Sequence, residues 1–126
     1  IRNANELHDA GVTFQAGDFF QYTPPESQLL FDSVLFCSSL HDLPDMMGAL
    51  DKAISLLTSP GGKLVLLHAQ GASHVVGQVK ANPVLVPRGL PTIEELRALE
   101  GVKVLVEPAA AKSKEESRLG YLAVLE

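Results

Sequence analysis

The sequence of 126 residues predicts an α/β fold whose sheet ends in an antiparallel hairpin. Two nearly continuous apolar runs, 29–37 and 63–68, are typical of strands that are covered on both faces within a parallel sheet. A helical pattern lies between these runs, so the three elements form a βαβ unit. Two further β-rich segments, 102–106 and 120–125, have no helix between them, and we expect them to pair antiparallel.

Composition limits the chain to one globular domain or part of one. Hydrophobic residues make up 46% of the sequence and charged residues 20%, which excludes a disordered region. The apolar runs are far shorter than the roughly 18 residues of a membrane span. The net charge is −5 and the ten basic residues are scattered, so we expect neither a membrane nor a nucleic acid as partner. The single cysteine, Cys37, predicts an intracellular, reducing compartment.

The first 20 residues predict the end of a helix followed by a strand. Ile1, Ala4 and Leu7 share one helical face, and Gly11 fits the position that ends a helix. We interpret Ile1 as a cut within a longer protein. The β-branched and aromatic segment 12–15 predicts a strand that ends in the loop 16–20.

The middle of the chain carries the helix of the βαβ unit. Asp45 is a good N-terminal cap, and the turn 59–62 ends the helix with proline and two glycines. Between them the apolar positions follow helical spacing: Met46, Met47, Leu50, Ile54 and Leu57.

The last third of the chain begins with a segment of weak pattern. Glycines and prolines interrupt residues 69–90, and a connection of this length is often a lid or a binding loop. Thr92 and Glu95 have the spacing of a capping box and predict a helix that continues past Leu96. The charged segment 112–118 predicts a solvated loop between the last two strands.

Three motifs in this order resemble the second half of a class I, Rossmann-like methyltransferase. The segment 12–19 is similar to the third strand of that family and the acidic residue after it. The segment 31–43 is similar to the fourth strand and the leucine–histidine run that follows. The segment 56–64 is similar to the proline–glycine–glycine entry to the fifth strand. The resemblance covers residues 1–126 as a partial domain that holds strands 3 to 7 of the family's sheet, and it leaves residues 69–90 as a region of variable sequence.

The resemblance implies a sheet order of 3-2-1-4-5-7-6 and S-adenosylmethionine as cofactor. It also implies methyl transfer to a small-molecule acceptor. The chain departs from the family pattern because it contains no Gly-x-Gly, the motif that lets the backbone approach the cofactor. We therefore expect an N-terminally truncated domain that, expressed alone, neither folds as a stable monomer nor binds the cofactor.

The resemblance assigns cofactor contacts to four residues that follow the third and fourth strands, where ligands bind in open α/β sheets. The Asp18 carboxylate would accept a hydrogen bond from the adenine amino group, with Phe19 beside the base. Cys37 and Ser38 would lie under the methionine portion and offer mainly backbone groups. The alternative for Asp18 is a turn residue that bonds to its own backbone.

His41 is the candidate catalytic residue. It follows the fourth strand and could act as a general base, although it could equally cap the next element. No Gly-x-Ser-x-Gly is present to support a hydrolase at Ser38 and Ser39. The other histidines, His8, His68 and His74, have no ligand spacing, so we expect no metal site.

Two alternative functions stay open from the sequence. One is a non-catalytic methyltransferase-like module that binds a partner or has a structural role, which suits the missing glycine-rich loop. The other is a nicotinamide-dependent reductase. It fits less well, because such folds usually continue with parallel strands and because the sequence has no Tyr-x-x-x-Lys pair.

Overall fold

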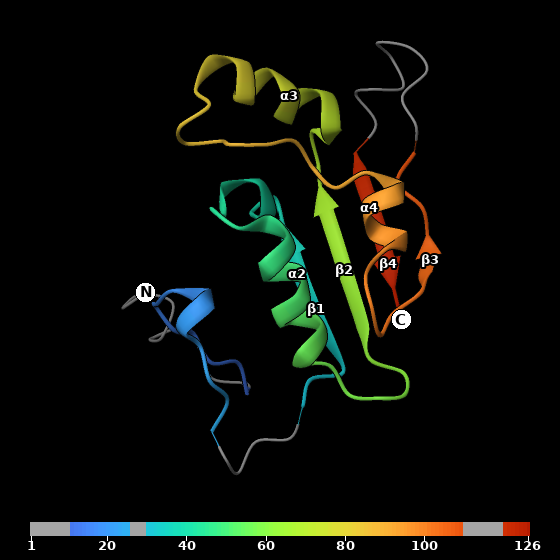
Figure 1. Cartoon of the computed structure of the whole chain (residues 1–126). Helices are drawn as coiled ribbons and strands as arrows, with labels where there is room; N and C mark the ends of the chain where they lie inside the picture. The colour runs from blue at the N-terminus through green and yellow to red at the C-terminus, as the bar shows by residue number, and fades with distance from the viewer. Residues whose placement is uncertain (1–10, 26–29, 110–119) are drawn as a thin grey trace.

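The computed structural model describes residues 11–25, 30–109 and 120–126. These residues form a small α/β structure with a mixed four-stranded sheet and three α-helices (Figure 1). The predicted helix end at residues 1–7 and the predicted loop 112–118 lie outside the described residues. No helix within the described residues has the length and apolar character to cross a membrane.

The predicted βαβ unit is confirmed. Strand β1 spans Ser33–Cys37, helix α2 spans Met46–Ser55, and strand β2 spans Lys63–His68. The two strands pair in parallel, with Leu35 opposite Val65. The carboxylate of Asp45 accepts the Gly48 N–H at 3.0 Å, which is the predicted N-cap.

Strand β1 is shorter than the predicted run 29–37. Before Ser33 only an isolated bridge joins Phe31 to Leu57, and Leu29 is outside the described residues. The turn before β2 uses Gly61 at φ +96° and Gly62, where a Cβ would lie 2.5 Å from the Thr58 carbonyl oxygen. Only glycine fits both positions, and this explains why the two adjacent glycines correctly predict the turn before β2.

The terminal hairpin is antiparallel, as predicted. Strand β3 spans Val104–Val106 and strand β4 spans Tyr121–Leu125, and β4 also pairs antiparallel with β2. The sheet order is therefore β1-β2-β4-β3, with the last strand of the chain inserted between β2 and β3. Each of the last two strands begins later than predicted, β3 at Val104 and β4 at Tyr121.

The segment between β2 and β4 contains two helices. Helix α4, Ile93–Arg97, begins at the predicted capping box of Thr92 and Glu95. Helix α3, Gly71–Ala81, occupies the first part of the segment that was predicted to be a loop, so that expectation is wrong there. Gly77 costs helix stability but does not stop the helix, and the prolines that end the pattern come only at Pro83 and later.

The predicted strand 12–15 is wrong. These residues are exposed and irregular, and the chain forms its first regular element only at the 3₁₀ turn η1, Phe19–Gln21. A strand needs a hydrogen-bonded neighbour, and none of the strands within the described part of the chain lies beside this segment.

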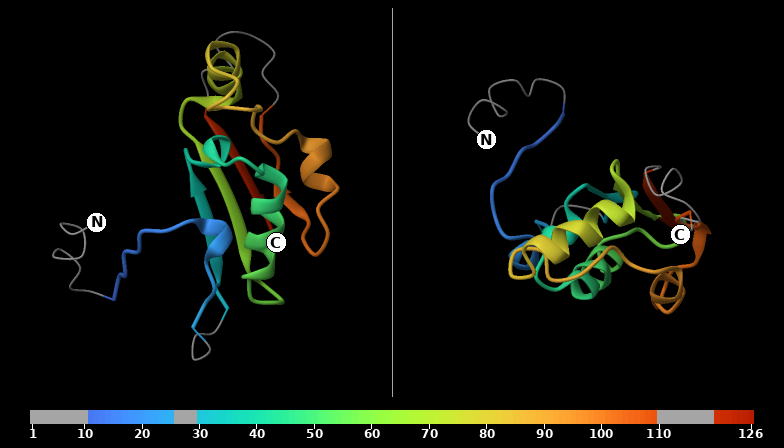
Figure 2. Two further views of the ribbon diagram at one scale, coloured as in Figure 1. Left: turned by 60° about the vertical axis from the view of Figure 1, so that its left-hand side comes forward. Right: turned by 90° about the horizontal axis from the view of Figure 1, so that it is seen from above.

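One face of the sheet is covered and the other is not. Helices α2 and α4 lie on the same side of the strands (Figure 2), and the core on that side is fully buried at Leu50, Leu64 and Leu66. On the opposite side Leu35 is 57% exposed and Leu122 is 42% exposed. The expectation that both faces of the strands are covered is therefore wrong for the described residues.

Candidate functional site

The carboxyl end of β1 carries a strained turn. Ser38 has a backbone φ of +51°, a conformation that residues other than glycine rarely adopt. Its N–H donates to the Leu67 carbonyl oxygen at 2.7 Å. Strain of this kind in a structure is often found at functional sites. The turn redirects the chain from Cys37, which is exposed, into the short 3₁₀ helix η2, Leu40–Asp42.

Helix η2 places His41 in the interior. The whole residue is 5% exposed, and its Nδ1 has no hydrogen-bond partner among the described residues. Its Nε2 lies 3.5 Å from Oδ1 of Asp42, whose side chain is largely exposed. Nε2 of the imidazole therefore faces the exposed carboxylate of Asp42, whereas Nδ1 is buried.

Two more histidines join His41 at this end of the sheet. His68, the last residue of β2, is also buried, and its ring lies edge-on to that of His41 with the centroids 4.8 Å apart. His74 on α3 follows, with its ring centroid 6.0 Å from that of His68. We call His41, His68 and His74 the histidine cluster. Sequence reasoning missed it, because the three residues meet only through the parallel register of β1 and β2 and the turn into α3.

Burial, and then the neighbouring imidazoles of His41 and His74, lower the pKa of His68 below its ordinary value, while Asp42 acts in the opposite direction. The backbone N–H of Gln70 donates to Nδ1 of His68 at 3.2 Å. This contact places the proton of neutral His68 on Nε2. His68 is therefore a neutral side chain at neutral pH.

Asp18 and Phe19 lie in another part of the structure, at η1. Oδ1 of Asp18 accepts the Phe20 N–H at 2.9 Å, which is the turn contact that the sequence left open as an alternative. The second carboxylate oxygen accepts no hydrogen bond from the residues that the structure describes. Asp18 and Phe19 line an open hollow of about 1010 Å³ together with Thr13, Gln15, Tyr22 and Phe31, among others.

The two groups of predicted cofactor residues are connected only indirectly. The ring of Phe19 packs edge-on against Phe36 with centroids 5.5 Å apart, and Phe36 directly precedes Cys37. Neither Cys37 nor Ser38 is among the described residues that line the Asp18 hollow. The structure thus brings Phe19 to the end of β1 without forming one pocket from all four residues.

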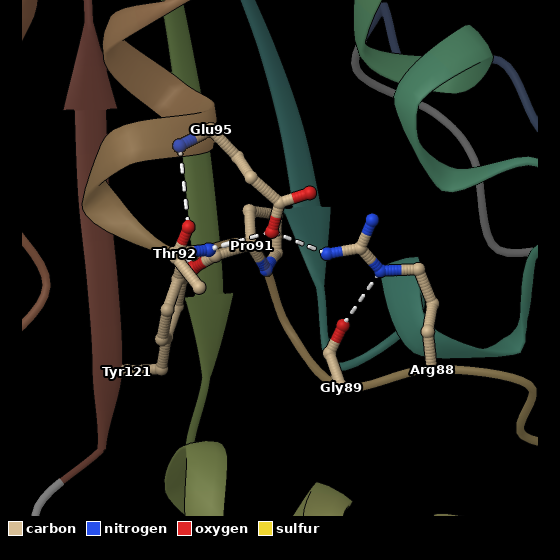
Figure 3. Close-up of polar contacts among 6 residues, drawn as sticks. All are labelled: Arg88, Gly89, Pro91, Thr92, Glu95 and Tyr121. Atoms are coloured by element: carbon tan, nitrogen blue, oxygen red, sulfur yellow. Dashed lines mark hydrogen bonds and ion pairs between the residues drawn. The ribbon is translucent and has the colours of Figure 1, made fainter.

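A polar network connects the stretch from Arg88 to Thr92 with helix α4 (Figure 3). Arg88 donates to Oε1 of Glu95 at 2.5 Å and to the Gly89 carbonyl oxygen at 3.1 Å. The same Oε1 accepts the Thr92 N–H at 3.1 Å, which completes the capping box. The hydrogen bond with Arg88 lowers the pKa of Glu95.

Tyr121 connects this network to the sheet. Its hydroxyl donates to the Pro91 carbonyl oxygen at 2.8 Å, and burial raises the pKa of Tyr121 above its ordinary value. Tyr121 is also the β4 residue opposite His68. The stretch from Arg88 to Thr92 is therefore held to α4 and to β4, whose Tyr121 lies opposite His68.

No group of three or more histidine, cysteine or acidic residues among residues 11–25, 30–109 and 120–126 has an arrangement that could hold a metal ion. No protein-family model matches the chain, and a search of curated proteins finds no match. The functional interpretation consequently depends on the topology and on the geometry of these residues.

Proposed function

We propose that this chain forms the C-terminal half of a Rossmann-like, class I methyltransferase domain. The intact protein would transfer a methyl group from S-adenosylmethionine to a small molecule. The observation that supports this most is the sheet order β1-β2-β4-β3, with the first pair parallel and the last strand inserted antiparallel. The resemblance implies the same order, 4-5-7-6, for the last four strands of the family.

The described residues fit the adenosine end of the cofactor. The second carboxylate oxygen of Asp18 accepts no hydrogen bond from the described residues and would accept one from the adenine amino group, and Phe19 lines the same open hollow. The strained turn at Ser38 stands where ligands bind in open α/β sheets, at the carboxyl end of β1. When bound, S-adenosylmethionine supplies a methyl group activated by a sulfonium.

The protein's own contribution to the transfer is alignment and exclusion of water. Direct in-line displacement gains most from holding the two reactants at the right distance and angle. The stretch from Arg88 to Pro91, held by Glu95 and Tyr121, would help to shape the acceptor pocket. His41 is the candidate general base.

Equilibrium dialysis with labelled S-adenosylmethionine tests this proposal. We expect the product of the complete open reading frame to bind it saturably, with no competition by NADH. We expect the 126-residue chain alone to bind poorly, because it has no Gly-x-Gly. Binding of labelled NADH in place of S-adenosylmethionine would favour the reductase. Binding of neither by the product of the complete open reading frame would favour the non-catalytic module.

A further inference from the structure

The turn η1 is attached to the rest of the fold by side chains. The four paired strands of the described residues do not include it. Phe19 and Phe20 pack against the core, and the Phe19 ring meets Phe36 edge-on. A three-residue 3₁₀ turn has too few hydrogen bonds of its own to keep a fixed place, so its position depends on such contacts.

Lys52 on α2 supplies two further contacts to this turn. Its Nζ donates to the Phe20 carbonyl oxygen at 2.7 Å and lies 5.5 Å from the centroid of the Phe19 ring. Lys52 is half-buried, and both contacts use the ammonium charge, which interacts more strongly where water is partly excluded. Phe20 and Lys52 are 32 positions apart in the sequence, so this hydrogen bond joins η1 to α2.

Helix α2 gives Lys52 a fixed base. Ala49, Leu50 and Ala53 are completely buried, and they hold the helix against the sheet. Lys52 lies in the last turn of α2, where a cation interacts favourably with the free carbonyl groups of the helix end. That role alone needs no ordered contact with η1, and ordering a lysine side chain costs conformational entropy. The contacts with η1 therefore point to a second role.

The second role concerns the hollow beside η1. Phe20 is held on both sides, because its N–H donates to Oδ1 of Asp18 at 2.9 Å while its carbonyl oxygen accepts from Lys52. Restraint of Phe20 thus also restrains the Asp18 carboxylate. Asp18 and Phe19 line the hollow, whereas Lys52 is not among the described residues that line it. Lys52 therefore acts on a ligand in the hollow through η1.

We propose that Lys52 is a positioning residue that determines how strongly the hollow prefers an adenine base, an inference that rests on the proposed binding of S-adenosylmethionine. By fixing Phe20, it keeps the Asp18 carboxylate at the wall of the hollow, where an acceptor-only group selects an amino group on the base. By contacting the ring of Phe19, it keeps an aromatic side chain beside that base. Without the ammonium group η1 samples other positions, and the carboxylate no longer meets the amino group at hydrogen-bonding distance.

NMR relaxation of the ligand-free product of the complete open reading frame tests the attachment of η1. We expect backbone order parameters of about 0.85 at Phe20 and Gln21 in the wild type. They should fall below about 0.6 in Lys52→Met, which keeps an apolar stem and removes the charge. Lys52→Arg still carries the charge and the donor groups and should stay near the wild type. Lys80→Met, which removes an exposed lysine from α3, is the matched control, and unchanged order parameters in Lys52→Met would overturn the proposal.

Calorimetry with S-adenosylhomocysteine and its inosine analogue, which lacks the amino group, tests the effect on the ligand. Lys52→Met should weaken binding of the adenosyl compound more than binding of the analogue, and lower the preference between them about 10-fold, because a hydrogen bond to a charged group is lost. Lys52→Arg should keep most of the preference, and Lys80→Met should keep all of it.

The outcomes separate this inference from the proposed function. An unchanged preference in Lys52→Met, or an equal loss of affinity for both compounds, would overturn the role of Lys52 in specificity and leave the proposed function standing. Binding of neither compound by the wild type would contradict the proposed function, and the specificity role with it. The relaxation measurement needs no ligand, so it decides the attachment of η1 in either case.

Discussion

Single residues at the ends of β1 and β2 combine strain, burial and charge in a way that the rest of the sheet does not. Ser38 adopts a left-handed conformation, Nδ1 of His41 has no hydrogen-bond partner in the described part of the chain, and His68 is buried in contact with another imidazole. Each of these features has a cost in stability that a purely structural turn would avoid. These residues lie at the carboxyl ends of two parallel strands, and we propose that the ligand binds there.

Ser38→Gly should raise the free energy of unfolding by about 1 kcal/mol, because glycine has no Cβ to strain at positive φ. Urea denaturation measures this. Ser39→Gly is the matched control, since Ser39 has φ −127° and its side chain makes no capping hydrogen bond. An equal or larger gain from Ser39→Gly would contradict the assignment of strain to Ser38.

The stability of the folded chain should fall as the pH drops through about 6.5. The pKa of His68 is lowered in the folded state, so below the ordinary histidine pKa the unfolded state binds more protons than the folded state. The stabilising effect of neutral His68 is complete above that pH and is lost below it. His68→Gln should make the free energy of unfolding depend less on pH between 7.5 and 5.5, and His74→Gln should have a smaller effect. Parallel pH profiles for wild type and His68→Gln would contradict this account.

Among the elements, α4 is the one whose existence depends most on its cap. It is only five residues long, and short helices are marginal without tertiary or capping contacts. Glu95 serves both the capping box and the ion pair with Arg88, so it connects α4 to the segment 82–92.

We expect Thr92→Ala to lower the free energy of unfolding by about 1 kcal/mol and Glu95→Ala to lower it more. Glu95→Gln should lower the free energy of unfolding less than Thr92→Ala or Glu95→Ala, because the amide oxygen can still accept a hydrogen bond from the Thr92 N–H. Thermal denaturation gives the order, with exposed Glu94→Ala as the control. A Glu95→Ala variant as stable as Glu94→Ala would show that the network contributes nothing.

At the scale of the whole molecule, the uncovered face of the sheet is the dominant feature. Apolar side chains run across all four strands on this face, and Leu35 at 57% and Leu67 at 37% exposure are examples. By register, the row from β1 to β3 consists of Leu35, Val65, Val124 and Val106. Such a surface normally marks an interface or promotes aggregation.

The 126-residue chain should therefore bind a hydrophobic dye such as ANS and associate at micromolar concentration. Leu35→Lys should reduce both, because it replaces the most exposed member of the apolar row, at its β1 end, with a charge. Ala72→Lys adds the same charge at an exposed position on α3 and should have little effect. Sedimentation velocity provides the second readout, and a monomer that binds no dye would contradict the prediction.

The sequence patterns correctly predicted the elements that are determined by residues close together in the sequence. The βαβ unit, the capping box at Thr92 and the antiparallel hairpin are all encoded in local spacing and turn residues. The strand 12–15 was wrong because a strand exists only with a partner, which local propensity cannot supply. Helix α3 was missed because Gly71 and Gly77 weaken the local helix propensity, although the folded helix contains both glycines.

The candidate site was predictable to the same extent. Asp18, Ser38 and His41 follow recognisable strand ends in the sequence. The contacts of His41 with His68, and of His68 with His74, depend on strand register and on the path of α3, which no local pattern contains. The Asp18 hollow is likewise built from residues on both sides of a segment outside the described residues.

Adenine recognition by Asp18 is the most direct test of the central claim, that this sheet holds an adenosyl group. We would titrate S-adenosylhomocysteine and its inosine analogue, which lacks the amino group, into the product of the complete open reading frame by calorimetry. A hydrogen bond to a carboxylate contributes about 1.5–3 kcal/mol, so the wild type should prefer the adenosyl compound by roughly 10- to 150-fold. Asp18→Asn should bring the two dissociation constants close together. Equal binding of the two compounds by the wild type, or no binding of either, would contradict the account.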